Sequence, residues 1–145
     1  MIVPDANLLL YAYDTTSPYH QAAAEWWEAT MSGTETVGLT HPVVFAFVRI
    51  ATSARVYTHP LTVAEAAAIV ESWTERTVTR VLRAGPDHVA AVLTLLATAG
   101  SSGGNLVTDA QIAALAREHR GVVHTADHDF RRFAEVRLHY PLTRR

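Results

Sequence analysis

The chain has 145 residues, of which 49% are hydrophobic, and a formal net charge of −2. This length and composition predict one folded domain over residues 1–145 and exclude a disordered chain. The absence of cysteine excludes disulfides, thiolate nucleophiles and cysteine-ligated zinc, and the net charge excludes a globally basic surface for nucleic acid. No apolar run reaches the length of a membrane span and the N-terminus lacks a signal-peptide pattern, so we expect a cytoplasmic protein without membrane contact.

A short buried strand is predicted at the start of the chain, where Ile2 and Val3 are apolar and β-branched. The strand ends at Asp5, and an apolar run over residues 8–11 follows. Asp5 has two interpretations. It can cap the helix that follows, or it can be an acid at the carboxyl end of a strand, where open α/β sheets bind ligands. Asn7 lies two residues further on, close to the same position.

The remaining elements are predicted from caps, apolar periodicity and alternation. Helices are expected over residues 19–31, 42–52, 62–73, 88–99 and 106–119, and strands over 36–39, 77–82, 121–125 and 136–140. Ser17 and Pro18 start the first of these helices, and Thr40 and Pro42 start the second. The second helix is apolar nearly all round, which predicts deep burial. Helices that alternate with short apolar strands predict an α/β fold with a parallel sheet flanked by helices.

Four acids stand in apolar or strand-end settings: Asp5, Asp109, Asp127 and Asp129. Asn105 is placed to cap the helix over 106–119, and Asp109 follows four residues later, on the same face and near the positive end of the helix. Asp127 and Asp129 follow the strand that ends at Thr125, so both carboxylates can be directed at one point.

Convergence of Asp5, Asp109 and Asp127 would require a counter-charge. Two carboxylates about 4 Å apart repel by about 4 kcal/mol at an effective dielectric constant near 20. Hard oxygen ligands without a thiolate favour Mg²⁺ or Mn²⁺, which can lower the pKa of a bound water and hold a phosphate for attack. The alternative is that each acid caps a helix or forms a turn by itself.

Three motifs, in matching order and spacing, resemble those of a known family: Ile2-Val3-Pro4-Asp5-Ala6-Asn7, Asn105-Leu106-Val107-Thr108-Asp109-Ala110 and Thr125-Ala126-Asp127-His128-Asp129-Phe130. With them the chain resembles PIN-domain ribonucleases, and among these the VapC toxins of bacterial toxin–antitoxin pairs, over essentially its whole length. The resemblance implies a PIN-like fold with a short parallel sheet. It also implies an Mg²⁺- or Mn²⁺-dependent endoribonuclease that hydrolyses RNA as the toxin of such a pair.

The resemblance assigns roles to particular residues. Asp5, Asp109 and Asp127 are expected to be catalytic and to bind metal, with Asp129 as a further ligand. Asn7, Asn105 and Thr125 are the small polar residues expected to line the site. Apart from the resemblance, Arg131, Arg132 and His128 near the acidic turn are candidates for substrate contact, because arginine suits phosphate recognition. The alternative is that these three side chains form an ordinary exposed surface. The resemblance further implies a homodimer and a cognate VapB-type antitoxin that places a basic side chain at the acids.

One position departs from the family pattern. Most members carry a Glu on the second main helix in a Glu-x-x-Arg pattern, whereas Ala46 stands here three residues before Arg49. We expect activity to persist, with Asp129 and Asn105 compensating. The alternative is a PIN-fold binding module with weak or no turnover that binds an antitoxin or RNA. A haloacid-dehalogenase-type phosphatase or a receiver domain fits less well, because the first needs Asp in place of Asn7 and the second needs a lysine, which the chain lacks.

Overall fold

The computed structural model of the chain describes residues 1–100 and 106–142. Its strands are β1 (Ile2–Pro4), β2 (Val37–Leu39), β3 (Thr79–Val81), β4 (Val122–His124) and β5 (Leu138–His139). Its helices are α1 (Ala6–Tyr13), α2 (His20–Ser32), α3 (His41–Ala51), α4 (Val63–Thr74), α5 (His88–Thr98), α6 (Leu106–Glu118) and the 3₁₀ helix η1 (His128–Arg132). The strands form one parallel sheet in the order β3-β2-β1-β4-β5, which confirms the predicted fold class.

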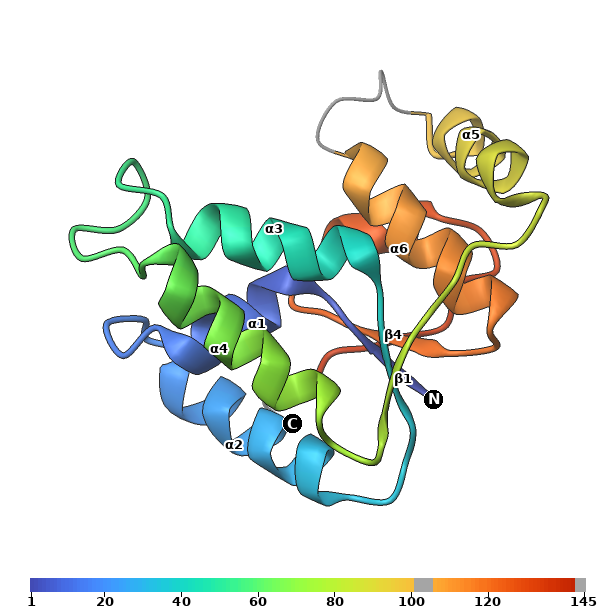
Figure 1. The fold of residues 1–145 in the computed structure, drawn as a ribbon. Helices are drawn as coiled ribbons and strands as arrows, with labels where there is room; N and C mark the ends of the chain where they lie inside the picture. Colours follow the sequence, from blue (N-terminus) through green and yellow to red (C-terminus); the bar gives the residue numbers. More distant parts are fainter. Residues whose placement is uncertain (101–105, 143–145) are drawn as a thin grey trace.

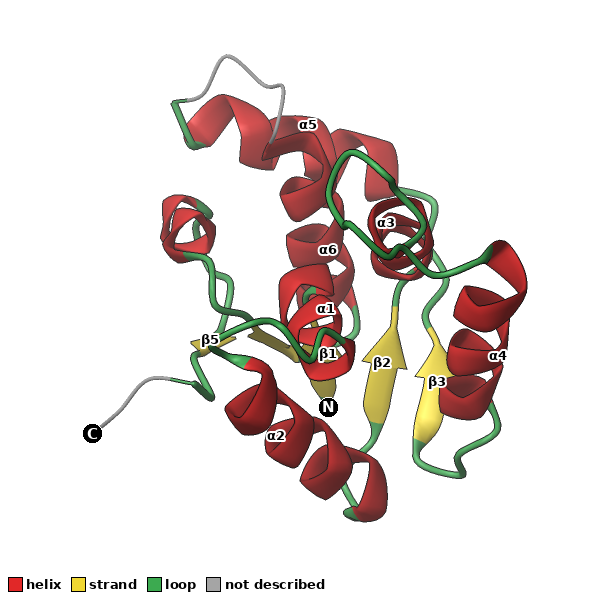
Figure 2. Ribbon diagram, turned by 90° about the vertical axis from the view of Figure 1, so that its left-hand side faces the viewer, coloured by secondary structure: helices red, strands yellow, loops and turns green. Residues whose placement is uncertain are grey.

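Helices cover both faces of the sheet. Figure 1 shows α1, α2 and α4 on one side of the strands and α5 and α6 on the other, while α3 crosses near the carboxyl ends of the strands. In Figure 2 the arrowheads of β2 and β3 point toward the end of the molecule where α3 lies. Strand β1 is central, because Ile2 pairs with Val37 of β2 and with Val122 of β4. Asp5, directly after β1, therefore stands at the middle of the carboxyl edge.

Side-chain caps fix where two of the helices begin. The Thr40 hydroxyl accepts a hydrogen bond from the amide of Val43 at 3.3 Å and so starts α3 directly after β2. At α4 the Thr62 hydroxyl accepts from the Glu65 amide, and the Glu65 carboxylate accepts from the Thr62 amide. Both starts were predicted from the sequence, because a cap and its partner lie within one turn. Among the residues that the structure describes, no helix is both long and apolar enough to cross a membrane.

Helix α2 begins one residue later than predicted, and the predicted cap at Ser17 is wrong. The helix begins at His20, and its N-cap, Tyr19, makes no side-chain capping bond. The Ser17 hydroxyl accepts from the Tyr19 amide at 3.1 Å instead. Such a bond, two residues along the chain, stabilises a turn in competition with a helix start. Tyr19 consequently faces Tyr11, and the two ring centroids lie 5.0 Å apart.

The expected deep burial of α3 is also wrong in part. Val43, Ala46 and Phe47 are buried, but the Phe45 side chain is 65% exposed. Helix α3 packs mainly against α1, α4 and α6, and the face that carries Phe45 is left exposed. A helix whose residues are apolar on every face is therefore not always buried on every face within its own domain.

Helix α6 stops one residue earlier than predicted. Arg120, two residues after the helix, adopts the left-handed conformation, with φ of 58°. Gly121 serves a different purpose. A Cβ atom there would lie 2.6 Å from Cγ2 of Val3, so glycine is needed for the close approach of the chain to β1.

Trp73 is the largest fully buried side chain of the core, and its replacement tests the packing between α4 and the rest of the domain. It is 1% exposed, its ring lies 4.8 Å from that of Phe47 and 5.7 Å from that of Trp27, and its indole N–H donates to the Tyr13 hydroxyl at 2.8 Å. Trp73→Ala is expected to lower the free energy of unfolding by about 3–5 kcal/mol in urea denaturation. Trp73→Phe keeps the apolar contacts and should cost clearly less. A loss below about 1 kcal/mol for the alanine variant would contradict this packing.

Candidate functional site

Asp5 is held by contacts both near and far in sequence. It is 4% exposed, and its amide donates to the carbonyl of His124 in β4 at 2.9 Å. One carboxylate oxygen, Oδ1, accepts from the Ala6 amide at 2.7 Å, so Asp5 does cap α1. The other, Oδ2, accepts from the Thr125 hydroxyl at 2.8 Å, across 120 residues of sequence. The capping interpretation and the strand-end interpretation thus both hold.

Thr125 links Asp5 to the acidic turn after β4. Its side chain is fully buried, and its hydroxyl oxygen also accepts from the amide of Asp127 at 2.9 Å. The carboxylate of Asp127 in turn accepts from the Asp129 amide at 2.8 Å, which starts η1. A chain of hydrogen bonds therefore fixes the backbone of the acidic turn relative to the end of β1.

Asp109 lies in the first turn of α6 and shares a cavity with Asp5. The cavity, which opens to solvent, has a volume of about 650 Å³. It is lined by residues of α1, α3 and α6 and by the end of β1: Asp5, Ala6, Asn7, Ala46, Arg49, Ile50, Thr108 and Asp109. We call it the acidic cavity. Asn7 and Ala46, two positions that the sequence singled out, both face it.

The carboxylates of this region influence one another's protonation. Burial raises the pKa of Asp5 to about 6, against hydrogen bonds from Thr125 and Ala6 that lower it, and the charge of Asp127 raises it further. Burial also raises the pKa of Asp109 to about 7, and the charges of Asp5, Asp127 and Asp129 add to the increase. Asp109 is thus the carboxyl group whose charged form the neighbouring acids disfavour most at this edge of the sheet.

Few cations balance these acids. Within residues 1–100 and 106–142, the four acids form a single ion pair, which joins Asp129 to Arg132 at 3.7 Å on the exposed side of η1. Arg49 lines the acidic cavity without pairing to any of them in the same ranges. In the described part of the chain, no three His, Asp or Glu side chains are placed to hold one metal ion. The carboxylate oxygens of these acids nonetheless suit a hard divalent cation, which would favour their deprotonated form. Binding of one ion by several of them would require the side chains to move closer together.

The other predicted site residues divide into three groups. His128 and Arg131 lie against Tyr140, with the His128 and Tyr140 ring centroids 4.9 Å apart and Arg131 Cζ 5.1 Å from the Tyr140 ring centroid. Arg132 pairs with Asp129, as described above. Asn105 lies outside the described residues.

Some residues at this end of the sheet were not predicted to belong to the site. The sequence placed Arg49 in the family pattern but gave it no role, although it lies three residues after Ala46 and so faces the same way on α3. Tyr11, Tyr19 and Tyr140 carried no sequence signal, because only the fold brings them together with Thr125 around a neighbouring cavity.

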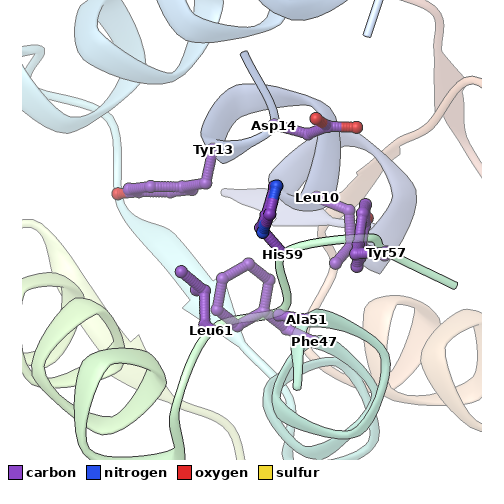
Figure 3. Close-up of a pocket in the computed structure, with 8 residues that line it drawn as sticks. All are labelled: Leu10, Tyr13, Asp14, Phe47, Ala51, Tyr57, His59 and Leu61. Carbon is purple, nitrogen blue, oxygen red and sulfur yellow. The ribbon is translucent and has the colours of Figure 1, made fainter. Parts of the chain in front are cut away.

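A separate cavity of about 340 Å³ lies between α1, α3 and the connection from α3 to α4 (Figure 3). Its lining is largely apolar and aromatic, with Phe47, Tyr57 and Leu61 among its members. Asp14 is its one acid, at the C-terminal end of α1 and away from the carboxyl edge of the sheet. This cavity therefore lacks the acidic character of the site around Asp5.

A short parallel sheet with acids gathered at the carboxyl ends of its central strands defines an α/β domain of the PIN type, and residues 2–136 match the PIN domain family. Ribonuclease VapC33 of Mycobacterium tuberculosis (strain H37Rv) is 45% identical over 142 residues, which cover 98% of this chain and 99% of that protein. Ribonuclease VapC37 of the same strain is 38% identical over 141 residues, 97% of each chain. The chain belongs to the PIN-domain family and, within it, to the VapC ribonucleases.

Solved structures agree with this fold. Mycobacterium tuberculosis VapC20, described as a Sarcin-Ricin loop cleaving toxin, matches with a TM-score of 0.68 at 21% identity, over 94% of this chain and 99% of that chain. A chain of VapBC-1 from nontypeable Haemophilus influenzae matches with a TM-score of 0.69 at 18% identity, over 99% of this chain and all of that chain. At such low identity these likenesses concern the fold alone.

Proposed function

We propose that this protein is an endoribonuclease that depends on Mg²⁺ or Mn²⁺ and acts in the cytoplasm as the toxin of a toxin–antitoxin pair. The observation that carries the proposal is the acidic cavity, where Asp5 and Asp109 share one space and the charge of Asp5 raises the pKa of Asp109. Sequence relatives named as ribonucleases, identical at up to 45% of positions over nearly the whole chain, favour RNA as the substrate.

Asp5, Asp109 and Asp127 are the residues that would hold the metal ion, with Asp129 as a further ligand and Asn7 and Thr125 beside it. When bound, such an ion lowers the pKa of a water and stabilises negative charge on a phosphodiester. The residues of the chain supply position and charge. The two hydrogen bonds to Asp5 fix its carboxylate, and Thr125 holds the backbone of Asp127 in register with it.

Arg49 is the cation of the acidic cavity. A guanidinium in this place can donate to the oxygens of a phosphate, because its planar fork matches their geometry. Arg131 and Arg132 are further candidates on η1, but Arg132 is already paired with Asp129. We propose Arg49 as a phosphate contact inside the site and Arg131 as one at its margin.

Two protein partners are part of the proposal. The first is a VapB-type antitoxin, which is consistent with neighbours solved as VapBC assemblies from Rickettsia felis and Salmonella typhimurium. A basic side chain from it would neutralise the clustered carboxylates and exclude RNA.

The second proposed partner is another copy of this chain. Large apolar side chains are exposed on α3, α5 and α6, which favours a homodimer. They are Phe45, Val89, Leu93 and Val107.

The nuclease proposal is tested by incubating the purified protein with mixed-sequence single-stranded RNA in the presence of Mg²⁺, Mn²⁺ or EDTA. Cleavage with either metal, absent in EDTA and absent for Asp5→Asn, is expected. Cleavage in EDTA would overturn the metal dependence. Intact RNA under all conditions would favour the alternative of a PIN-fold binding module. Ala46 supports that alternative, since it leaves the wall of the acidic cavity on α3 without a carboxylate.

The consequence of Ala46 can be measured directly. The residue faces the open acidic cavity, so a longer side chain can extend into it without displacing the core. Ala46→Glu is expected to tighten Mn²⁺ binding by about tenfold or more, because it adds an oxygen ligand beside Asp5 and Asp109. Calorimetric titration gives the dissociation constant. Ala54→Glu, which adds the same charge on the exposed connection after α3, is the control. Equal affinity of Ala46→Glu and the wild type would contradict the placement of the metal.

A further inference from the structure

A second cavity lies directly beside the acidic cavity, on the other side of Thr125. It is open to solvent, with a volume of about 520 Å³. Its lining comes from α1, the start of α2 and the segments after β4 and β5: Tyr11, Tyr19, Thr125, Ala126, His128, Tyr140 and Leu142. We call it the aromatic pocket. Thr125 connects the two cavities, because it lines the aromatic pocket and its hydroxyl donates to Asp5, which lines the acidic cavity.

Aromatic faces enclose the aromatic pocket from two sides. Tyr11 and Tyr19 form one pair, with ring centroids 5.0 Å apart and ring planes at 42°. His128 and Tyr140 form the other, stacked with centroids 4.9 Å apart and planes at 30°. Such surfaces accept a flat, unsaturated ring between or against them.

Two polar groups, one on Tyr140 of the aromatic pocket and one on Arg131 beside it, are unused within the described residues. The buried hydroxyl of Tyr140 has no hydrogen-bond partner among the residues that the structure describes, and such a group ordinarily finds one. Arg131 lies over the Tyr140 ring with Cζ 5.1 Å from its centroid, and among the described residues it forms no ion pair. A ligand with a hydrogen-bonding edge and a nearby anionic group would satisfy both.

The electrostatic field of the acids reaches into this pocket. Burial raises the pKa of Tyr11, and the neighbouring Tyr19 and the charges of Asp5 and Asp127 raise it further. The negative charges of Asp5 and Asp127 therefore act on Tyr11, a residue that lines the aromatic pocket. Thr125, which lines the aromatic pocket, is hydrogen-bonded to Asp5 and to the amide of Asp127, so the pocket and these acids share one residue.

We propose that the aromatic pocket receives an unstacked base of single-stranded RNA, one nucleotide away from the phosphate that is cleaved. The proposal rests on the proposed nuclease function. It adds a subsite that would distinguish an RNA with accessible bases from a sugar-phosphate chain without bases. The base stacks on the tyrosine rings, its edge bonds to the Tyr140 hydroxyl, and Arg131 contacts the backbone. Paired bases are stacked within a duplex and cannot enter, so single-stranded RNA is the substrate class.

The experiment compares two RNA-like ligands that carry the same charge. One is a fluorescein-labelled, mixed-sequence single-stranded RNA, and the other is an abasic ribose-phosphate chain of the same length. Dissociation constants are measured by fluorescence anisotropy in EDTA, where turnover does not interfere, for the wild type, Tyr19→Ala and Tyr140→Phe. Tyr57→Phe, which removes a hydroxyl at the cavity of Figure 3, is the control. Tyr19 is 52% exposed and Tyr140→Phe removes one unpartnered hydroxyl, so both variants should fold.

The wild type is expected to prefer RNA to the abasic chain by about fivefold or more. Tyr19→Ala should weaken RNA binding by about 5- to 50-fold and Tyr140→Phe by less, with abasic binding unchanged in both. Equal affinity of the wild type for the two ligands, or variants that bind RNA as the wild type does, would overturn the proposal. The latter is the result expected if the pocket serves a peptide partner. Cleavage with Mg²⁺ or Mn²⁺ is measured separately. Preference for RNA over the abasic chain without cleavage would contradict only the proposed nuclease function. Cleavage without that preference would contradict only the proposed base-binding role of the aromatic pocket.

Discussion

Asp109→Asn is expected to lower metal-dependent RNA cleavage by at least about 100-fold and, at the same time, to stabilise the metal-free protein. Loss of a partner behind a metal ligand costs about 10- to 100-fold in affinity or activity, so loss of a ligand should cost more. Asparagine keeps the size of the side chain and removes its charge. The loss of cleavage therefore reports the charge, and not a cavity in the core.

The stabilisation follows from the raised pKa of Asp109. A carboxyl group whose pKa is about 7 in the folded protein and 3.8 in the unfolded chain favours folding fully below pH 3.8, and this contribution is lost as the pH rises through 7. At neutral pH the metal-free wild type retains the repulsion among its acids. Removal of the charge should raise the free energy of unfolding by about 1–2 kcal/mol there, after allowance for solvent screening of a half-buried group.

Urea denaturation in EDTA and the cleavage assay with Mn²⁺ test both effects on the same samples. Glu71→Gln, which removes one exposed charge on α4 far along the chain from these acids, is the matched control and should change neither value. A variant at Asp109 that cleaves RNA normally would remove this residue from the site. A variant that is inactive and less stable than the wild type would mean that the residue supports the fold.

Acidification should abolish metal binding before it unfolds the protein. Metal binding needs the carboxylate forms of Asp5 and Asp109, whose pKa values are about 6 and about 7. The fraction of molecules with both groups deprotonated falls about 100-fold between pH 7.5 and pH 5.5. We expect the apparent dissociation constant for Mn²⁺ to rise by about this factor over the same interval. Cleavage at limiting metal should fall in parallel.

Asp109→Asn again supplies the diagnostic comparison. Its residual metal binding should lose affinity only as Asp5 is protonated, with an inflection near pH 6 and a shallower slope. Saturating Mn²⁺ should move the acidic limb of the wild-type cleavage profile to lower pH, because the metal competes with protons for the same oxygens. A profile flat from pH 7.5 to 5.5 would show that neither raised pKa governs the site.

Elements with local signals were predictable from the sequence. The caps at Thr40 and Thr62 lie within one turn of the groups they bond to, and apolar strands alternate with helices along the chain, which is enough to indicate a parallel sheet. The exposure of Phe45 could not be predicted in the same way. Its hydrophobicity favours burial, and only the arrangement of α3 against three other helices leaves that side open.

The gathering of acids at one edge of the sheet was predictable in part. Asp5 follows a strand and Asp109 lies in the first turn of a helix, and the two share the acidic cavity. In the described part of the chain, no three of the predicted acids are placed to hold one metal ion. The contact from Thr125 to Asp5 spans 120 residues and has no signature in either segment alone. The same holds for the aromatic pocket, whose tyrosines come from segments that local patterns treat as ordinary turn or helix residues.

A titration of the metal-free protein with Mn²⁺, followed by electron paramagnetic resonance at pH 7.5 for the wild type and for Asp5→Asn, addresses the site most directly. The wild type is expected to bind Mn²⁺ with saturation and a defined stoichiometry, through carboxylates that follow the first strand and lie in two distant segments. Asp5→Asn should remove this binding. Identical titration curves for both proteins, with the fold of each intact, would contradict the assignment of these acids to a metal centre.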